Sequence, residues 1–263
     1  MKAIILAAGE GKRLQPLTND KPKCMVDLFG KSLLEYQIDV FRTCNISDIS
    51  IITGYKNEMI HFPDIQYYNN PNFETTNMVE TLFCAENALH GDVIISYGDI
   101  IFEKKVLQKL IRSEHDNSVI VDLNWKKYWE ERFENPLEDA ESLVQDAEGF
   151  IHSIGQNVSD YADIQSQYIG LMKFQDNGLR SLKEVYKNAK TNSISGRNIL
   201  NPNLPFSKSY MTDLLQEMIS SGHKIMGIPI NGGWLELDSI SDYDLYNKKH
   251  LDGTLSEFIN IEK

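Results

Sequence analysis

Cysteine is scarce in this sequence: its 263 residues contain three, at positions 24, 44 and 84, with no Cys-x-x-Cys spacing. An odd number of unpaired cysteines excludes a disulfide scaffold and a zinc knot, and it fits a reducing compartment. Long apolar runs are also missing, because the run over residues 3–8 is too short for a signal-peptide core or a membrane-spanning helix. We therefore expect a cytoplasmic protein with no membrane partner.

Basic residues are also fewer than acidic residues. The chain has 26 lysines and arginines against 38 aspartates and glutamates, which gives a net charge of −12. This balance excludes nucleic acid and anionic membrane surfaces as main partners. Glycine (16) and proline (8) are too few for a disordered or fibrous chain, and 41% hydrophobic residues suffice for a core. The six histidines lie in separate segments, without metal spacing or a nucleophile and base arrangement.

What the sequence does contain is an alternation of strand-like and helix-like segments. Apolar runs predict strands over residues 3–8, 49–52, 65–68, 93–97, 119–123, 224–230 and 234–237. Helical periodicity predicts helices over residues 32–43, 77–89, 104–113, 178–189 and 210–220, and another at the C-terminus. Strands and helices in this order indicate an α/β fold with a mostly parallel sheet and helices on both faces.

The middle of the chain departs from this alternation. Residues 124–146 are rich in Trp, Glu and Asp, and strands are predicted at 150–154 and 168–174. No Pro/Gly/Ser linker brackets the region. We therefore expect one domain, with a core formed by 1–123 and 175–263 and an insertion over 124–174.

A glycine-rich loop follows the first predicted strand, where phosphate-binding loops occur in parallel sheets. A dinucleotide fingerprint would require a third glycine where Leu14 stands, and the Gly-Lys-Ser/Thr of a Walker loop is absent. The loop offers the charged side chains of Arg13 and Lys23 to an anion.

The whole loop, Gly-Glu-Gly-Lys-Arg-Leu-Gln-Pro-Leu-Thr-Asn-Asp-Lys-Pro-Lys over residues 9–23, matches the signature Gly-x-Gly-x-Arg-Leu-x-Pro-Leu-Thr-x-x-x-Pro-Lys. The chain thus resembles the sugar-phosphate nucleotidyltransferase-like superfamily. The resemblance implies a Rossmann-like sheet of the nucleotide-diphospho-sugar transferase type and one nucleotidyltransferase domain. The nucleotide-binding residues that it implies are Leu6, Ala7, Ala8, Gly9, Glu10, Gly11, Lys12, Arg13, Lys23, Thr76, Asn77, Tyr97 and Gly98.

Carboxylates follow two predicted strands. Asp99 follows the strand at 93–97 after one glycine, Gly98, and this resembles the place where the superfamily holds a magnesium ion. Glu236 and Asp238 are two residues apart on an extended segment, so their side chains point to one face and can reach one cation. The resemblance implies Mg²⁺ as cofactor, with Asp99, Glu236 and Asp238 as its ligands.

Two segments narrow the resemblance to a subfamily. The stretch 73–82, with its Thr-Asn-Met, and the block 125–141 look like cytidylyltransferases of phosphocholine, 2-aminoethylphosphonate and phosphoglutamine, the last from capsule-modification pathways. The partners implied are CTP and a small phosphorylated or phosphonate acceptor.

A sugar-1-phosphate nucleotidyltransferase using UTP, dTTP or GTP is the rival hypothesis, disfavoured because a Gln-x-x-x-Gly-Thr-like segment is missing. A regulatory domain without turnover is another, and the sequence leaves the oligomeric state open, a homodimer included.

Within this hypothesis each charged residue has an expected role. Lys23 would contact the α-phosphate and the incoming anion, and Arg13 the β- and γ-phosphates. Asp99 and Asp238 would hold the magnesium, with Glu236 as a further ligand or a close support. No general base is required, because an acceptor phosphate with a second pKa near 6 is largely ionised at neutral pH.

The acceptor-binding residues that we predict are Trp125, Trp129, Arg132, Asp139, Glu141, Gln167, Tyr168 and Lys173. Aromatic rings beside carboxylates suit an ammonium group, whereas Arg132 suits a carboxylate. Two alternatives remain: Trp125 and Trp129, at i and i+4, are core residues, and Lys173 is a solvent-exposed lysine at a strand end.

Overall fold

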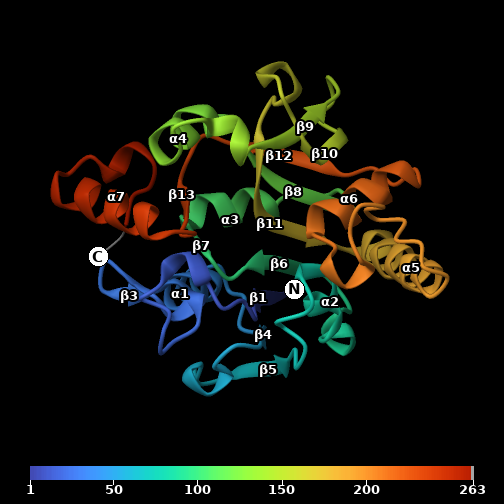
Figure 1. Ribbon diagram of the computed structural model, residues 1–263, viewed down its shortest axis with the longest axis horizontal. Coiled ribbons are helices and arrows are strands. Elements are labelled where there is room, and N and C mark those ends of the chain that lie inside the picture. Colours follow the sequence, from blue (N-terminus) through green and yellow to red (C-terminus); the bar gives the residue numbers. More distant parts are fainter. Residues whose placement is uncertain (262–263) are drawn as a thin grey trace.

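A seven-stranded sheet forms the centre of the computed structural model, which describes residues 1–261 (Figure 1). Its strand order is β12-β8-β11-β6-β1-β4-β5. The strands are β1 (Lys2–Ala7), β4 (Ile49–Thr53), β5 (Ile65–Asn69), β6 (Val93–Tyr97), β8 (Asn117–Asp122), β11 (Gln167–Phe174) and β12 (Met226–Ile230). β11 runs antiparallel to both neighbours, and the other six strands are parallel. The predicted α/β fold with a mostly parallel sheet is confirmed.

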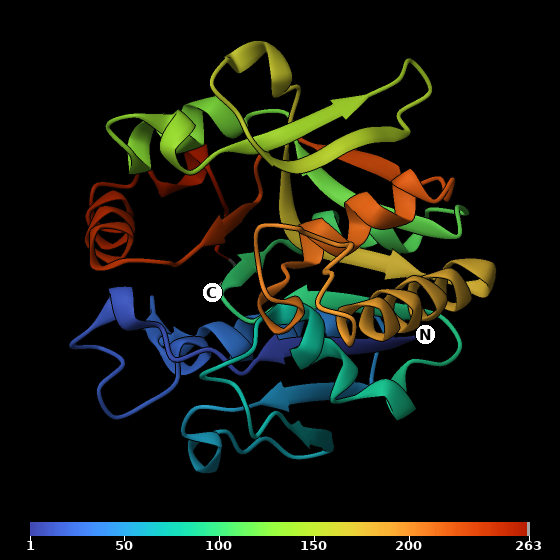
Figure 2. The same ribbon diagram turned by 45° about the vertical axis from the view of Figure 1, so that its right-hand side comes forward.

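Helices cover both faces of the sheet (Figure 2), whose strands are apolar on both sides. Ile5 packs in one core cluster with α1 (Leu33–Thr43) and α3 (Lys104–Ile111), whereas its neighbour Ile4 packs in the other. The second cluster contains α2 (Met78–Phe83), α5 (Asp176–Ser193) and α6 (Met211–Ser220). Both isoleucines are fully buried. This double burial explains the uninterrupted apolar run of β1.

Several helices and strands have bounds in the structure that differ from those predicted from the sequence. The helix expected over 77–89 is shorter in the structure, because α2 ends at Phe83. A separate 3₁₀ turn follows at Glu86–Ala88. The segment 168–174 was assigned to the insertion, but β11 lies between β6 and β8 in the main sheet. The inserted part is therefore 124–166. It contains α4 (Trp125–Arg132) and the antiparallel pair β9 (Glu141–Gln145) and β10 (Ile151–Asn157).

A small antiparallel ladder joins the C-terminal part of the chain to the sheet. β7 (Ile100–Phe102) follows β6 and pairs with β13 (Trp234–Glu236), and the amide of Leu237 donates to the carbonyl of Asp99 at 2.9 Å. α7 (Ile240–Leu251) follows β13 and contacts α4 (Figure 1). A second short ladder pairs β2 (Asp27–Leu28) with β3 (Lys31–Ser32). In the part of the chain that the structure describes, no helix has the length and apolarity needed to cross a bilayer.

Candidate active site

A pocket opens at the carboxyl ends of β1 and β6, facing the start of α2. It is lined by Leu6, Ala7, Ala8, Gly9, Lys23, Cys24, Phe73, Thr76, Asn77, Met78, Thr81, Tyr97, Gly98 and Asp99. Most of the predicted nucleotide-binding residues are among them. Residues 10–13 of the glycine loop lie outside this lining. Phe73, Met78 and Thr81 were not singled out, although they belong to the segment 73–82 that carried the subfamily resemblance.

Lys23 lines this pocket and binds two carboxylates. Its Nζ donates to Oδ2 of Asp99 at 2.7 Å and to Oδ1 of Asp238, and its side chain is 14% exposed. Burial alone would lower the pKa of Lys23, but Asp99, Asp238 and Glu236 together raise it above its usual value. The lysine therefore stays protonated at neutral pH, as an anion-binding role requires.

Arg13 contacts one of these carboxylates, Asp238, from the solvent side. Its Nη2 donates to Oδ2 of Asp238 at 2.9 Å, and its side chain is 65% exposed. Within the glycine loop, the Thr18 hydroxyl donates to the carbonyl of Gly11 at 2.8 Å and anchors the turn. The two basic side chains thus approach Asp238 from opposite ends of the loop.

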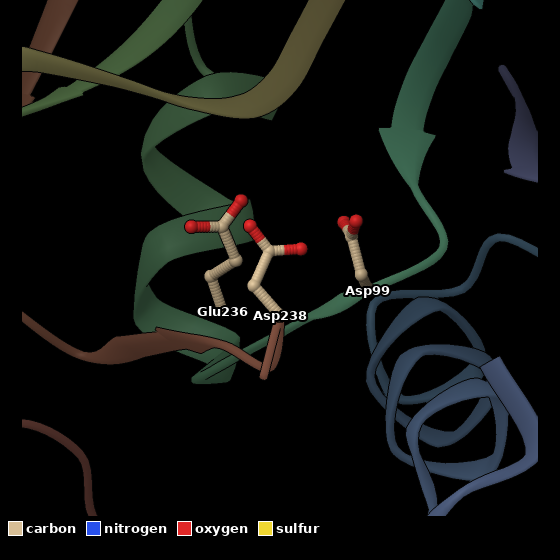
Figure 3. Close-up of side chains that lie close together, drawn as sticks. All are labelled: Asp99, Glu236 and Asp238. Atoms are coloured by element: carbon tan, nitrogen blue, oxygen red, sulfur yellow. The ribbon is translucent and has the colours of Figure 1, made fainter. Parts of the chain in front are cut away.

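Asp99, Glu236 and Asp238 form a cluster in which one ligand atom from each lies within 4.8 Å of the others (Figure 3). Burial and the neighbouring Asp238 raise the pKa of Glu236 to about 8. Burial would raise the pKa of Asp238 too, but contact with Lys23 lowers it overall. Three oxygen ligands at one point suit a hard divalent cation.

One carboxylate oxygen of this cluster, on Asp99, has no hydrogen-bond donor in the described part of the chain. Oδ1 of Asp99 is buried and, among residues 1–261, has no hydrogen-bond partner. A buried carboxylate oxygen without a partner is costly unless something else coordinates it. The three carboxylates and this oxygen fit a bound divalent cation.

Arg132, predicted from the sequence to bind the acceptor, is instead paired with carboxylates inside the protein. Its side chain is fully buried; Nη1 donates to Oε2 of Glu236 and Nε to Oδ1 of Asp242, both at 2.9 Å. The reason is helix α4, which turns the guanidinium inward toward α7. Because its side chain is 0% exposed, unlike that of Lys23, the guanidinium of Arg132 has no surface from which to contact a ligand.

The two predicted tryptophans are core residues, so the alternative interpretation of them is the correct one. Trp125 and Trp129 are each 4% exposed, and their rings pack edge to face at 6.2 Å. The indole of Trp129 donates to Oδ2 of Asp139 at 3.0 Å. Burial raises the pKa of Asp139 above its usual value.

Lys173 was also misplaced by the sequence argument. It is 2% exposed, and its Nζ donates to the carbonyls of Ser113 at 2.6 Å and Ile111 at 3.2 Å. Because β11 is antiparallel, a residue near its end pairs with the beginnings of β6 and β8, at the edge of the sheet away from the pocket. Lys173 caps the end of α3 instead.

The remaining predicted acceptor residues gather beside the pocket. Tyr168 packs edge to face against Tyr97, a pocket residue, at 5.8 Å. The amide of Gln167 exchanges hydrogen bonds with the backbone of Glu141. Burial, followed by the charges of Asp213 and Asp139, raises the pKa of Glu141 to about 7. No motif in the sequence indicated Asp213.

Comparisons with known proteins show which family the chain resembles. Residues 3–150 match the family described as the MobA-like NTP transferase domain. A CTP:phosphoglutamine cytidylyltransferase of Campylobacter jejuni is 38% identical over 260 residues, which cover 95% of this chain and 100% of that protein. A choline-phosphate cytidylyltransferase of Streptococcus pneumoniae is 34% identical over 119 residues, or 44% of this chain and 52% of that protein.

The fold likewise matches a solved structure. CTP:phosphocholine cytidylyltransferase from Streptococcus pneumoniae superposes with a TM-score of 0.70 at 21% identity, and the match covers 94% of this chain and 97% of that chain. At this identity the likeness shows the fold.

Proposed function

This chain belongs to the MobA-like NTP transferase family, and from that premise we propose that it is a cytidylyltransferase. It transfers CMP from CTP to a small phosphorylated or phosphonate acceptor and releases pyrophosphate. The observation that carries the proposal is the meeting of Lys23 with Asp99 and Asp238 beside a pocket at the carboxyl ends of β1 and β6. The relative that is similar over nearly its full length supports CTP and a phosphorylated acceptor. Three free cysteines agree with a cytoplasmic reaction.

The chemistry required of the chain is mainly electrostatic. An acceptor phosphate is largely ionised at neutral pH, so it can attack the α-phosphorus of CTP without a general base. Two polyanions must nevertheless approach each other, and charge must leave on pyrophosphate. Lys23, buried and protonated, binds the α-phosphate and the incoming oxygen, and Arg13 binds the leaving phosphates. Preorganised charges of this kind supply most of the catalysis in phosphoryl transfer.

The carboxylate cluster is the site for a divalent cation in this proposal. Asp99 and Asp238 would hold Mg²⁺, with Glu236 as a further ligand. Such an ion neutralises phosphate charge and orients the triphosphate. The buried, unpartnered oxygen of Asp99 supports this assignment.

An acceptor that carries an ammonium group fits the insertion better than one recognised through a carboxylate. Arg132 is paired internally, whereas the pKa values of Tyr97 and Tyr168 are raised by burial and also by the nearby carboxyl group of Glu141, and the rings of these tyrosines pack edge to face. Aromatic faces and carboxylates together bind organic cations. We assign the nucleotide and cation to the core, 1–123 and 167–263, and the acceptor to the interface of that core with residues 124–166, all within one domain.

A matrix of substrates tests the proposal. CTP, UTP, dTTP and GTP are each combined with phosphocholine, aminoethylphosphonate, phosphoglutamine and glucose 1-phosphate, and pyrophosphate release is measured with Mg²⁺. We expect turnover with CTP and an acceptor that carries an ammonium group. Preferred turnover of UTP with glucose 1-phosphate would instead establish a uridylyltransferase, the activity named for a Haloferax volcanii relative 32% identical over 138 residues. CTP binding without turnover for every acceptor would favour a regulatory domain.

A further inference from the structure

A buried ion pair joins α4 to α7 directly behind the carboxylate cluster. Arg132 and Asp242 have side chains that are 0% and 3% exposed. The guanidinium donates to Asp242 twice, from Nε to Oδ1 at 2.9 Å and from Nη2 to Oδ2 at 3.3 Å. Its remaining nitrogen, Nη1, donates to Oε2 of Glu236 at 2.9 Å. One side chain of α4 thus connects α7 to a candidate metal ligand.

Asp242 in turn holds the backbone of the second candidate ligand on this segment. Its Oδ2 accepts from the amide of Asp238 at 3.0 Å and from that of Ser239 at 2.9 Å. The Ser239 hydroxyl accepts from the amide of Asp242, which completes a capping box at the start of α7. The first turn of α7 therefore fixes the position of Asp238.

The backbone of Glu236 is held by the same two helices. Its amide donates to the hydroxyl of Tyr128 at 2.9 Å, and its carbonyl accepts from the hydroxyl of Tyr246 at 2.7 Å. The two hydroxyls also bond to each other. Tyr128 lies four residues before Arg132, and Tyr246 four residues after Asp242, so each pair occupies one helix face. Both polar backbone groups and the carboxylate of Glu236 are therefore fixed from α4 and α7.

Stability alone is a weak explanation for this arrangement. A buried ion pair loses much of its attraction to desolvation, and an apolar pair of similar volume often stabilises a fold as well. An apolar pair, however, could not direct Glu236 Oε2 or the amide of Asp238. Residues behind a metal site that orient its ligands typically affect metal affinity strongly.

We propose that Arg132 and Asp242 are positioning residues, whose ion pair orients the carboxylates of Glu236 and Asp238 toward a divalent cation shared with Asp99. The inference rests on the cation site of the proposed function. It assigns to α4, on the acceptor side of the molecule, a role in cation binding.

The test measures Mn²⁺ binding by the full chain without nucleotide, from the loss of the free Mn²⁺ EPR signal. Arg132→Lys keeps the charge but cannot reproduce the fork of hydrogen bonds. We expect it to weaken Mn²⁺ binding about 10- to 100-fold. Asp242→Asn should act in the same direction, because it also frees the amides of Asp238 and Ser239.

A matched control breaks another ion pair between the same helices. Lys249 of α7 contacts Glu131 of α4 at 3.2 Å, and neither residue bonds to Glu236 or Asp238 in the described part of the chain. Lys249→Met should leave Mn²⁺ affinity unchanged. Thermal melting of each variant shows that it is folded, and if Asp242→Asn fails to fold, Arg132→Lys decides.

The outcomes separate this inference from the proposed function. Wild-type Mn²⁺ binding that Asp99→Asn does not weaken would refute the cation site and the inference with it. Binding that depends on Asp99 but is unchanged in folded Arg132→Lys would overturn the inference alone, as would an equal loss in Lys249→Met. In kinetics we expect the Mg²⁺ concentration for half-maximal turnover to rise, with a smaller change in the KM for CTP.

Discussion

Lys23 contacts both aspartates of the cation cluster and also lines the nucleotide pocket. We predict that Lys23→Ala lowers kcat by about 10²–10³, the usual cost of removing one preorganised charge from a reacting centre. Arg13→Ala should raise the KM for CTP as well as lower kcat, because Arg13 is 65% exposed and the proposed function assigns it to the leaving phosphates. Steady-state kinetics at saturating acceptor checks both.

Lys31→Ala is a suitable control for these two variants. Its ammonium pairs with Asp39 on the surface at 2.7 Å, with a side chain 46% exposed, and such pairs contribute little. Kinetics near those of the wild type are expected. If Lys23→Ala and Arg13→Ala change only the KM for CTP, and by equal amounts, the separate roles assigned to them are wrong.

The aspartates of the cluster allow a second prediction. Asp99→Asn and Asp238→Asn should abolish Mg²⁺-dependent turnover while the fold remains, since each removes one ionised oxygen ligand. Ligands of a catalytic metal contribute several kcal/mol to the transition state. Activity assayed against Mg²⁺ concentration, with circular dichroism for the fold, measures the effect. Rates like those of the wild type in either variant would refute the metal assignment.

Glu141 makes stability depend on pH in a predictable direction. Its pKa rises from 4.5 to about 7 on folding, so the folded state binds the proton more tightly than the unfolded state. That contribution is fully present below pH 4.5 and is lost as the pH rises through 7. Glu141→Gln should therefore gain stability over the wild type with rising pH, by at most roughly 3 kcal/mol. Urea unfolding at pH 5 and pH 8 measures this, and a difference that is constant with pH would contradict it.

At the scale of elements, β11 shapes the pocket through a bulge. Its register shifts between Tyr168 and Met172, and Gly170 within the shift has a φ of +82°. A Cβ at this position would lie 2.5 Å from the ring of Tyr97, a pocket residue. We predict that Gly170→Ala costs about 1–3 kcal/mol of stability and raises the KM for CTP by displacing Tyr97.

Gly222→Ala is the control that distinguishes contact with the Tyr97 ring from the backbone strain of an alanine at positive φ. Gly222 has a similar φ of +89°, but a Cβ there meets nothing within 4 Å. Denaturation and CTP kinetics of both variants provide the comparison. If Gly222→Ala raises the KM for CTP as much as Gly170→Ala does, contact with Tyr97 is not the cause.

Local sequence pattern predicted most strands of the central sheet and most of the helices, but it missed helix α4 and the short strands β2, β3, β7 and β9. The alternation of strands and helices and the resemblance of the glycine loop to nucleotidyltransferases are confirmed, since both depend on contiguous residues. The direction of β11 could not be predicted, because an antiparallel strand buried on both faces has the same apolar run as a parallel one. Helix α4 was not among the predicted helices, although the alternative interpretation of Trp125 and Trp129 as core residues at i, i+4 spacing already indicated a buried helical face.

The same limit applies to the site. The sequence was sufficient to predict that the three carboxylates form one cluster. Each of them, Asp99, Glu236 and Asp238, lies in or just after a predicted strand, and the ends of these strands were expected to meet at one edge of the sheet. The partners of Arg132 could not be predicted in this way, since Asp242 is 110 residues away and belongs to a capping box with its own local explanation. From sequence alone, a charged residue that pairs with a distant residue of the same chain cannot be distinguished from one that binds a ligand.

At the scale of the whole molecule, the position of β11 constrains the order of folding. β1, β4, β5 and β6 are neighbours within the first 97 residues, whereas β8 lies between β11 and β12, both of which come later in the chain. Pairings between distant segments form late because loop closure must precede them. We predict that pulse-labelled hydrogen exchange during refolding shows protected amides in β1 and β4 before β8. Simultaneous protection would argue for one cooperative step.

The same topology has a consequence during synthesis. A nascent chain that has emerged only to residue 123 carries β8 with neither of its sheet neighbours and β6 with one unpaired edge. Exposed apolar strands of this kind pair readily with other chains. Until Gln167–Phe174 leaves the ribosome, β8 is thus the segment most in need of a chaperone, and slow translation of the insertion would prolong its exposure.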